Sequence, residues 1–304
     1  DTSHPSHAAA KQQLQTLQRA IGILKRCDEQ PQTCPVKGLS WKRIARDHCI
    51  CCQHRSAFFL PWHRLYLRNF EDIVRALTGD NTFAMPYWRF VHEPRDHTGS
   101  VERRYQVPVF LQSEQEYPEF YAKRNAANYE ANGREQLAPS TLGYSFCSTT
   151  FDEFGGRQIN PVIPNWDNKE CPVVVGGVNL RACREQSWVG SSPAGYLEKG
   201  PHAAVHQLLG APNFVMGSLP LAAEDPVFWF VHANIDRLYS HWLEQHSNVV
   251  SDLRSEDTYA AWRGQQFQFI GPNGAARVLS VQQTLDWEYV YPKDTLVMVK
   301  CKQP

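Results

Sequence analysis

Apolar residues recur three or four positions apart in several stretches of the chain, and polar residues fill the positions between them. This spacing places the apolar side chains on one face of a helix. It predicts helices over residues 8–25, 61–78, 196–210 and 226–246. Gly79 is a typical stop for the second of these helices, because glycine readily adopts the left-handed conformation that ends a helix.

The fourth predicted helix has a clear start. Asp225 is a good N-cap, and Pro226 suits a first turn that needs no backbone N–H donor. Residues 80–195 are rich in proline, glycine, asparagine and serine and are only weakly periodic, so we predict long loops with short elements there. Alternating apolar positions at 267–269 and 296–299 predict a few short strands.

These elements predict a mainly α-helical protein with long loops and a few short strands. The chain has 304 residues, enough to bury a sizeable core. We expect one domain over residues 1–304. No apolar run reaches the ~20 residues that a bilayer span needs.

Charge and cysteine content narrow the function classes. Lys plus Arg and Asp plus Glu are both 31, and this balance argues against nucleic-acid and anionic-membrane partners, which need a basic excess. Nine cysteines favour an oxidising compartment, so we predict a secreted protein. The start at Asp1, without a methionine, is typical of a processed form.

The histidines of the third and fourth predicted helices suggest a metal site. His202 and His206 are four apart and share one helix face, although this spacing also occurs by chance. His232 lies in an apolar run where an unpaired imidazole would be costly. His54 and His63, with His48 upstream, form a second set. Neutral imidazole suits zinc, copper, iron and nickel alike, so these residues alone indicate one or two histidine-rich sites without naming the metal.

The remaining histidines have simpler interpretations. A single histidine in a loop is more often a capping residue than a ligand, and we interpret two of them in this way, His92 and His97. We interpret four others as surface residues: His4, His7, His241 and His246.

Several motifs resemble one known family. The runs at 59–64 (FLPWHR) and 225–237 (DPVFWFVHANIDR) resemble the two copper signatures of the type-3 copper proteins. The segments 85–88 (MPYW) and 289–291 (YVY) resemble motifs that follow the first site and close the catalytic core. They occur in family order, and the resemblance covers most of the chain.

The resemblance to tyrosinases and catechol oxidases implies an antiparallel four-helix bundle around a dinuclear copper centre. The first copper ion would bind His48, His54 and His63, and the second His202, His206 and His232. His48 is closer to His54 than the first ligand is in most relatives. The implied activity is oxidation of o-diphenols to o-quinones by O2, with a phenolic small molecule as substrate.

Nine cysteines cannot all pair in disulfides, and the family offers a role for the remaining one. In some members a cysteine two residues before the second histidine forms a thioether to it, and Cys52 and His54 have this spacing. The other eight cysteines could then form four disulfides. The alternatives are a disulfide at Cys52 and one buried free thiol.

Two carboxylates resemble residues that assist the family's copper ligands. Glu198, one turn before His202, resembles a glutamate that positions a water, although a glutamate in a first turn also favours the helix dipole. Asp236, one turn after His232, resembles an aspartate in the hydrogen-bonded support of the ligands. Pairing with Arg237 or another cation is the alternative.

Four positions depart from common family patterns. Ala203 replaces an asparagine found in efficient monophenol hydroxylases, which predicts that diphenol oxidation dominates and hydroxylation is weak. Leu219 lies where plant relatives place a phenylalanine, which predicts a more open pocket. Val231 and Arg89 replace a histidine and an aspartate without removing a ligand.

Rival functions remain within and outside this class. A true tyrosinase or an o-aminophenol oxidase would use the same metals. An O2 carrier resembling haemocyanin, a zinc hydrolase and a metal-structured binding module are further alternatives. The chain ends soon after Tyr291, so we expect no C-terminal lid domain.

Overall fold

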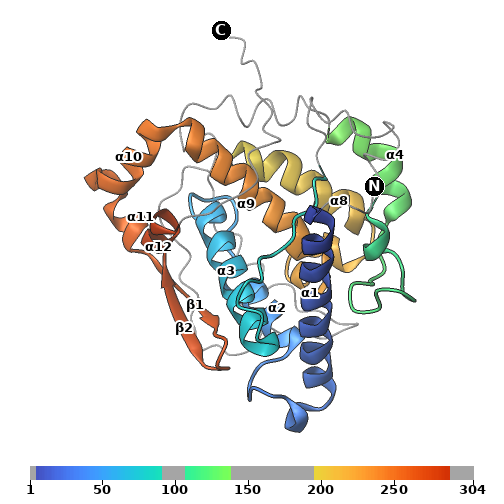
Figure 1. The fold of residues 1–304 in the computed structure, drawn as a ribbon. Coiled ribbons are helices and arrows are strands. Elements are labelled where there is room, and N and C mark those ends of the chain that lie inside the picture. Colours follow the sequence, from blue (N-terminus) through green and yellow to red (C-terminus); the bar gives the residue numbers. More distant parts are fainter. Residues whose placement is uncertain (1–4, 91–106, 138–194, 288–304) are drawn as a thin grey trace.

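The computed structural model describes residues 5–90, 107–137 and 195–287. Helices make up most of this part of the chain, as predicted, and they surround a buried centre (Figure 1). The longer helices are α1 (Pro5–Glu29), α2 (Trp41–Cys51), α3 (Phe59–Thr78), α4 (Ala126–Gln136), α8 (Ala203–Gly210), α9 (Val227–Gln245) and α10 (Ser247–Ser255).

Short elements connect and flank these helices. Two are short helices near the described C-terminal end, α11 (Ala260–Gly264) and α12 (Val281–Asp286). The 3-10 turns are η1 (Pro31–Thr33), η3 (Val109–Leu111), η5 (Val215–Gly217), η6 (Ala222–Glu224) and η7 (Asp257–Tyr259).

The predicted end of α3 is confirmed, and α9 starts at Val227, one residue later than predicted, with Pro226 in place of Asp225 at the N-cap position. Gly79 ends α3 with a φ of 74°, in the left-handed region where a side chain is disfavoured. The Asp225 carboxylate accepts a hydrogen bond from the Val227 backbone N–H (2.9 Å) at the start of α9. It also pairs with Arg124 across the fold (2.6 Å).

The predicted helix over 196–210 is not one regular helix. A π-helical turn, η4 (Glu198–His202), precedes α8, and Gly200 within it has non-helical backbone angles. Pro201 lacks a backbone N–H, so the regular hydrogen-bond ladder cannot continue through this point. Wider turns of this kind occur often at functional sites, and this one presents Glu198 and His202 to the same cavity.

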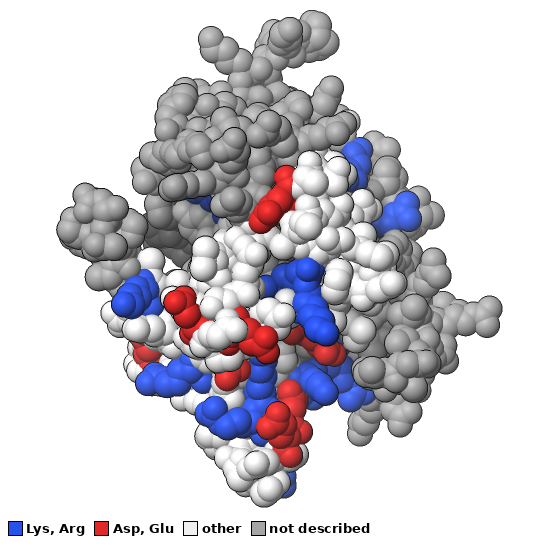
Figure 2. Space-filling view, turned by 90° about the vertical axis from the view of Figure 1, so that its right-hand side faces the viewer, with Lys and Arg blue, Asp and Glu red and all other residues white. Residues whose placement is uncertain are grey.

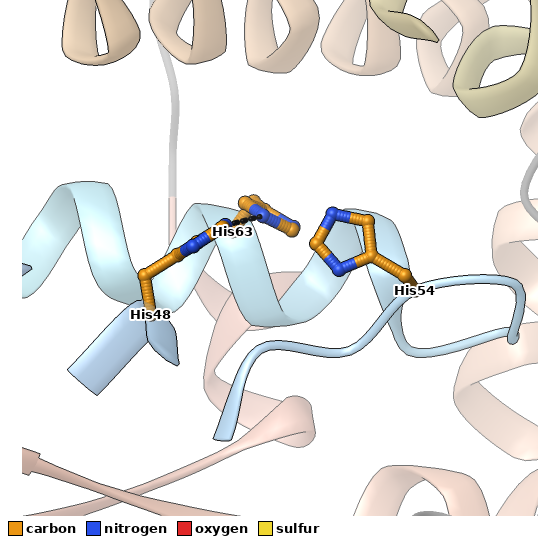
Figure 3. A group of neighbouring side chains, drawn as sticks. All are labelled: His48, His54 and His63. Carbon is orange, nitrogen blue, oxygen red and sulfur yellow. Dashed lines mark hydrogen bonds between the residues drawn. The ribbon is translucent and has the colours of Figure 1, made fainter. Parts of the chain in front are cut away.

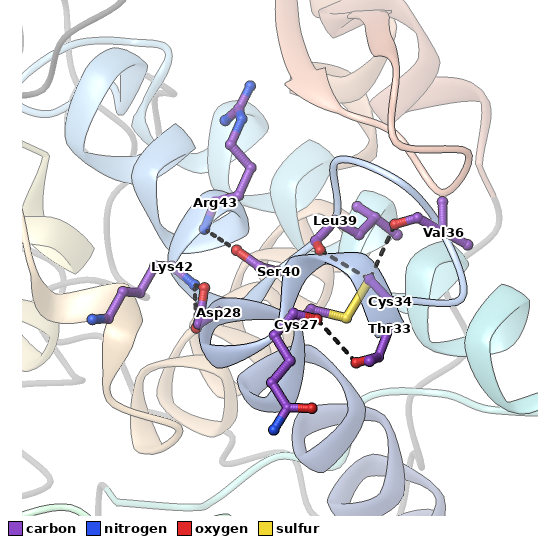
Figure 4. Close-up of a disulfide and its surroundings, with 10 residues drawn as sticks. Cys27, Asp28, Thr33, Cys34, Val36, Leu39, Ser40, Lys42 and Arg43 are labelled. Carbon is purple, nitrogen blue, oxygen red and sulfur yellow. Dashed lines mark hydrogen bonds between the residues drawn. A yellow bond between two sulfur atoms is a disulfide. The ribbon is translucent and has the colours of Figure 1, made fainter.

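Helix α2 was not predicted from the sequence, yet it carries His48. The Ser40 side chain caps it by accepting from the Arg43 backbone N–H (3.2 Å). A disulfide between Cys27 and Cys34 holds the preceding turn against α1 (Figure 4). The start of α2 therefore has a cap and a nearby cross-link, and its 11 residues bury a short apolar face that includes Trp41, Ile44 and Ala45.

Two strands form an antiparallel hairpin beside α2 and α3 (Figure 1). They are β1 (Gln266–Ile270) and β2 (Ala276–Ser280), with Gln268 opposite Val278. The first matches the predicted strand at 267–269, and the second was not predicted. The strand predicted at 296–299 lies outside the described residues. In the predicted loop region 80–195, helix α4 is a further element that the sequence pattern did not indicate.

The core between α3 and α9 is built mainly from aromatic side chains. The Phe70 and Trp229 rings stack with centroids 3.9 Å apart, and Tyr66 packs against Trp229. All three are buried. Such pairs add roughly 0.5–1.5 kcal/mol beyond the burial of their area, so they fix the relative position of the two helices.

The surface reflects the balanced composition. On the face drawn in Figure 2, acidic and basic side chains are interspersed over the described residues. That part of this face has no extended patch of one sign.

Candidate metal centre

The first histidine triad joins α2, the loop that follows it and α3. His48 lies near the end of α2, His54 in the loop and His63 in the second turn of α3. The three imidazoles point toward one another (Figure 3), and one nitrogen of each lies within 4.8 Å of the others. The Nε2 atoms of His48 and His63 are 3.4 Å apart.

The second triad joins η4, α8 and α9. His202 ends η4, His206 lies one turn later and His232 lies in the second turn of α9. Their ligand atoms also lie within 4.8 Å of one another, and the Nε2 atoms of His206 and His232 are 3.4 Å apart. Among the described residues, these two triads are the only groups of three or more side chains that could hold a metal ion.

The two triads are neighbours. The rings of His63 and His232 are stacked, with centroids 4.4 Å apart and planes inclined by 10°. His54 and His202 also face each other across the boundary, with ring centroids 5.7 Å apart. The arrangement therefore provides two adjacent sites rather than two separate ones.

Backbone carbonyls orient two of the rings. His63 Nδ1 donates to the Phe59 carbonyl (2.7 Å), and His206 Nδ1 donates to the Met216 carbonyl (2.8 Å). Each hydrogen bond places the proton on Nδ1 and leaves the lone pair of Nε2 free to bind a metal ion, as in metal-bound histidines. The Met216 carbonyl reaches His206 because Gly210 and Gly217 are in contact, and a Cβ on Gly210 would lie 1.8 Å from the Gly217 nitrogen.

The chemistry of the six imidazoles fits a pair of transition-metal ions. Burial lowers the pKa of all six below the ordinary value of histidine, so they are neutral and can act as ligands. His54 and the Nε2 of His202 are buried without a hydrogen-bond partner. Two nitrogens bound at tetrahedral angles to one ion lie roughly 3.3 Å apart, close to the 3.4 Å of each Nε2 pair.

Two phenylalanines enclose the triads, and sequence reasoning missed both roles. Phe59 lies 4.7 Å from the rings of His63 and His202. Phe228 lies 4.1 Å from the ring of His232. Both phenylalanines are fully buried, so they exclude water from the sides of the centre and restrict the rotation of the rings. Both lie within the copper-signature runs quoted from the sequence, so those motifs could have indicated them.

A cavity of about 550 Å³ opens onto the two triads. The lining includes four of the side chains predicted to matter for chemistry: His54, Glu198, Ala203 and Leu219. The second triad contributes His202 and His206. The sequence-predicted pocket residues are therefore brought together at the metal centre.

Glu198 is buried in this cavity and held by one backbone group. Both of its carboxylate oxygens accept from the Arg55 backbone N–H, at 2.8 and 2.9 Å. Burial raises the pKa of Glu198 to about 8, and the Arg55 N–H partly offsets this rise. A carboxyl with such a pKa can exchange a proton near neutral pH.

Known proteins are similar to this chain in sequence and in fold. The family profile described as "Common central domain of tyrosinase" matches residues 25–245. The chain belongs to the tyrosinase family. It is 30% identical over 254 residues to a tyrosinase of Hahella sp. (strain CCB-MM4), covering 79% of this chain and 47% of that protein. It is 26% identical to the chloroplastic polyphenol oxidase of Vitis vinifera, covering 94% of this chain and 46% of that protein.

A solved structure supports the fold. The crystal structure of Grenache (Vitis vinifera) polyphenol oxidase matches with a TM-score of 0.62 and 23% identity, over 91% of this chain and 79% of that one. The chain spans about half the length of the two curated relatives. None of the described helices combines the length and hydropathy of a membrane span.

Asp236 pairs with a buried cation. Its carboxylate accepts from Arg64 Nε at 2.6 Å, and both side chains are buried. Arg64 also donates to the Ser240 hydroxyl (2.5 Å). Pairing with another cation, Arg64, is therefore observed, and the pair links the helices that carry His63 and His232.

The cysteines agree only in part with the prediction. Cys27 and Cys34 form a disulfide, and Cys49 is also disulfide-bonded. Cys51 is a buried thiol that donates to the Asp47 carbonyl (2.9 Å), so the expectation that it joins a disulfide was wrong. Cys52 is buried next to the first triad, and its thioether to His54 stays a prediction. Four cysteines lie outside the described residues: Cys147, Cys171, Cys183 and Cys301.

The surface interpretation of His241 was wrong. Its side chain is 1% exposed on α9. His246 is half-buried, stacks on Trp242 and donates to its carbonyl (2.8 Å). The other histidine side chains named above lie outside the described residues.

The remaining motifs pack around the centre. Trp88, in the segment that follows the first site, donates its backbone N–H to the Phe230 carbonyl on α9 (3.1 Å). Val231 is buried and Arg89 is half-buried. The segment 289–291 lies outside the described residues.

Proposed function

We propose that this chain binds two copper ions through its six clustered histidines and oxidises o-diphenols to o-quinones with O2. The observation that carries the proposal is the stacking of His63 on His232, which makes the two neutral triads adjacent. In the net reaction, two catechols each lose two electrons and two protons, and one O2 becomes two waters. The proposed centre requires no carboxylate or thiolate ligand.

Bound copper would supply the one-electron steps that couple a catechol to O2. The chain's own residues hold and enclose the substrate. The apolar side chains of Met216 and Leu219 line the cavity and suit a flat ring. Glu198 opens onto the same cavity and can take up a proton from a phenolic hydroxyl. Phe59 and Phe228 restrict the ligand rings.

We infer that o-diphenols are the main substrates. Ala203 lies beside His202 in the cavity lining, and its methyl group cannot donate or accept a hydrogen bond. A water held near Glu198 would therefore lack a side-chain partner at position 203. This supports slow monophenol hydroxylation. A true tyrosinase or an o-aminophenol oxidase remains the alternative.

The deciding experiment combines metal analysis with oxygen uptake. We expect about two copper ions per chain, one for each triad, rapid uptake with catechol and a lag with tyrosine. Ala203→Asn should raise the ratio of tyrosine to catechol turnover by roughly threefold or more, because one added hydrogen bond is worth about 0.5–1.5 kcal/mol. Zinc in place of copper, reversible O2 binding without quinone, or equal turnover of the two substrates without a lag would contradict the proposal.

Leu219 supports a tolerant pocket. Leu219→Phe adds a ring to the cavity lining, and we expect KM for catechols with a bulky ring substituent to rise about tenfold, a cost within the 1–3 kcal/mol of overpacking. The KM for unsubstituted catechol should change much less. Steady-state kinetics with both substrates check this, and an equal rise for both would show that Leu219 does not act through size.

We also propose that residues 1–304 form one catalytic domain and that the protein is secreted. The disulfide between Cys27 and Cys34 supports an oxidising compartment. Curated plant relatives are named as chloroplastic, so secretion would set this chain apart from them.

A further inference from the structure

Two basic side chains stand at the cavity that leads to the triads. Arg55 follows His54, and Lys199 follows Glu198. Both line the cavity and both are exposed. They come from segments more than a hundred residues apart, so the fold, rather than a local run of charge, brings them to one site.

The described lining has more basic than acidic side chains, and Arg55 attracts its acidic one. Glu198 is its one carboxyl residue, and both of its oxygens already accept from the Arg55 backbone N–H. The charged groups that face the cavity from this part of the chain are therefore two exposed cations and one buried carboxyl. An anion at the cavity would meet a net positive field.

The backbone and a ring help to hold the cations in place. Arg55 has a φ of 53°, a left-handed conformation that is uncommon for a residue with a side chain. This conformation accompanies the hydrogen bond from its N–H to Glu198, so the start of the side chain is fixed beside the cavity. Lys199 Nζ lies 3.9 Å from the centroid of the Tyr196 ring, which favours one position of the ammonium group.

The rest of the lining is apolar or neutral. Ala203, Met216, Gly217 and Leu219 contribute no charge. An o-diphenol that turns its two hydroxyls to the histidines places its ring among these residues. A substituent on the opposite edge of the ring then points outward, toward the solvent-exposed cations.

We propose that the preferred substrates are o-diphenols that carry a carboxylate on a short side chain opposite the two hydroxyls, selected by Arg55 and Lys199. This inference rests on the proposed function, because it names the substrate class of the same centre. Each exposed ion pair contributes little, about 0.2–1 kcal/mol. We therefore expect about a 1.4- to 5-fold effect from each cation and about 2- to 30-fold from both.

The test measures selectivity with a matched substrate pair. A catechol with a propionate chain and the methyl ester of that catechol share ring and shape and differ in charge. The readout is the ratio of kcat/KM for the acid to kcat/KM for the ester. The variants are Arg55→Gln, Lys199→Gln and their combination, and Arg55→Lys keeps the charge. Lys11→Gln, an exposed α1 lysine outside the cavity lining, is the matched control.

We expect the native protein to prefer the acid, with a ratio that falls as salt is raised from about 0.01 to 1 M, because the screening length shortens from about 30 to 3 Å. Each Gln variant should lower the ratio, whereas Arg55→Lys and Lys11→Gln should retain it. An equal fall with both substrates, or a ratio that salt does not change, would overturn the inference and leave diphenol oxidation intact. Failure to oxidise either catechol would overturn the proposed function and this inference together.

Discussion

Replacing His232 by alanine should reduce bound copper from about two ions to one per chain and abolish catechol oxidation. His232 is 1% exposed, its Nε2 lies 3.4 Å from that of His206, and its ring stacks on His63. Loss of an outer partner of a metal ligand already costs about 10–100-fold, so loss of the ligand itself should exceed about 100-fold. Metal analysis and oxygen uptake on the same preparation measure both effects.

His246→Ala is the matched control for this prediction. His246 lies just beyond the end of the same helix, where its ring stacks on Trp242 and takes no part in either triad. We expect this variant to keep both metal ions and its oxidase activity. Circular dichroism shows whether each variant folds. Two copper ions in a folded His232→Ala protein would contradict the proposed ligand set.

Asp236→Ala should destabilise the protein by about 3–5 kcal/mol, because removing one partner of a buried ion pair is strongly destabilising. Arg64 and Asp236 are both 3% exposed and lie 2.6 Å apart. The change removes a carboxylate that joins α3 to α9 and leaves the Arg64 guanidinium buried. Urea unfolding of the metal-free protein, followed by circular dichroism, gives the difference in the free energy of unfolding.

The double variant Arg64→Met with Asp236→Leu separates charge from packing. Apolar side chains of similar volume often replace a buried ion pair at little cost, so we expect it to recover most of the stability lost in Asp236→Ala. If Asp236→Ala instead leaves the metal-free protein as stable as the native chain and weakens only copper binding, then Asp236 acts through the ligands rather than through the ion pair.

Long apolar patterns predicted the long helices α3 and α9 and missed shorter ones such as α2 and α4. Helices α3 and α9 carry broad apolar faces with clear stop and start residues, so local sequence determines them. Helix α2 has 11 residues and depends on the Ser40 cap, the nearby disulfide and a long-range contact. The buried Asp47 carboxylate accepts from the Ile270 backbone N–H (2.6 Å), and no local pattern indicates a partner 223 residues away.

The sequence by itself indicated the six histidines. His63 and His232 lie within the two copper-signature runs, His202 and His206 share a helix face, and His48 and His54 precede the first run. Only the tertiary structure decided how they meet. The stacking of His63 on His232 and the pairing of Arg64 with Asp236 join residues far apart in the chain. The Met216 carbonyl reaches His206 through the close contact of Gly210 with Gly217. Periodicity reports which face of an element is buried, whereas packing of side chains between elements decides which groups lie within bonding distance.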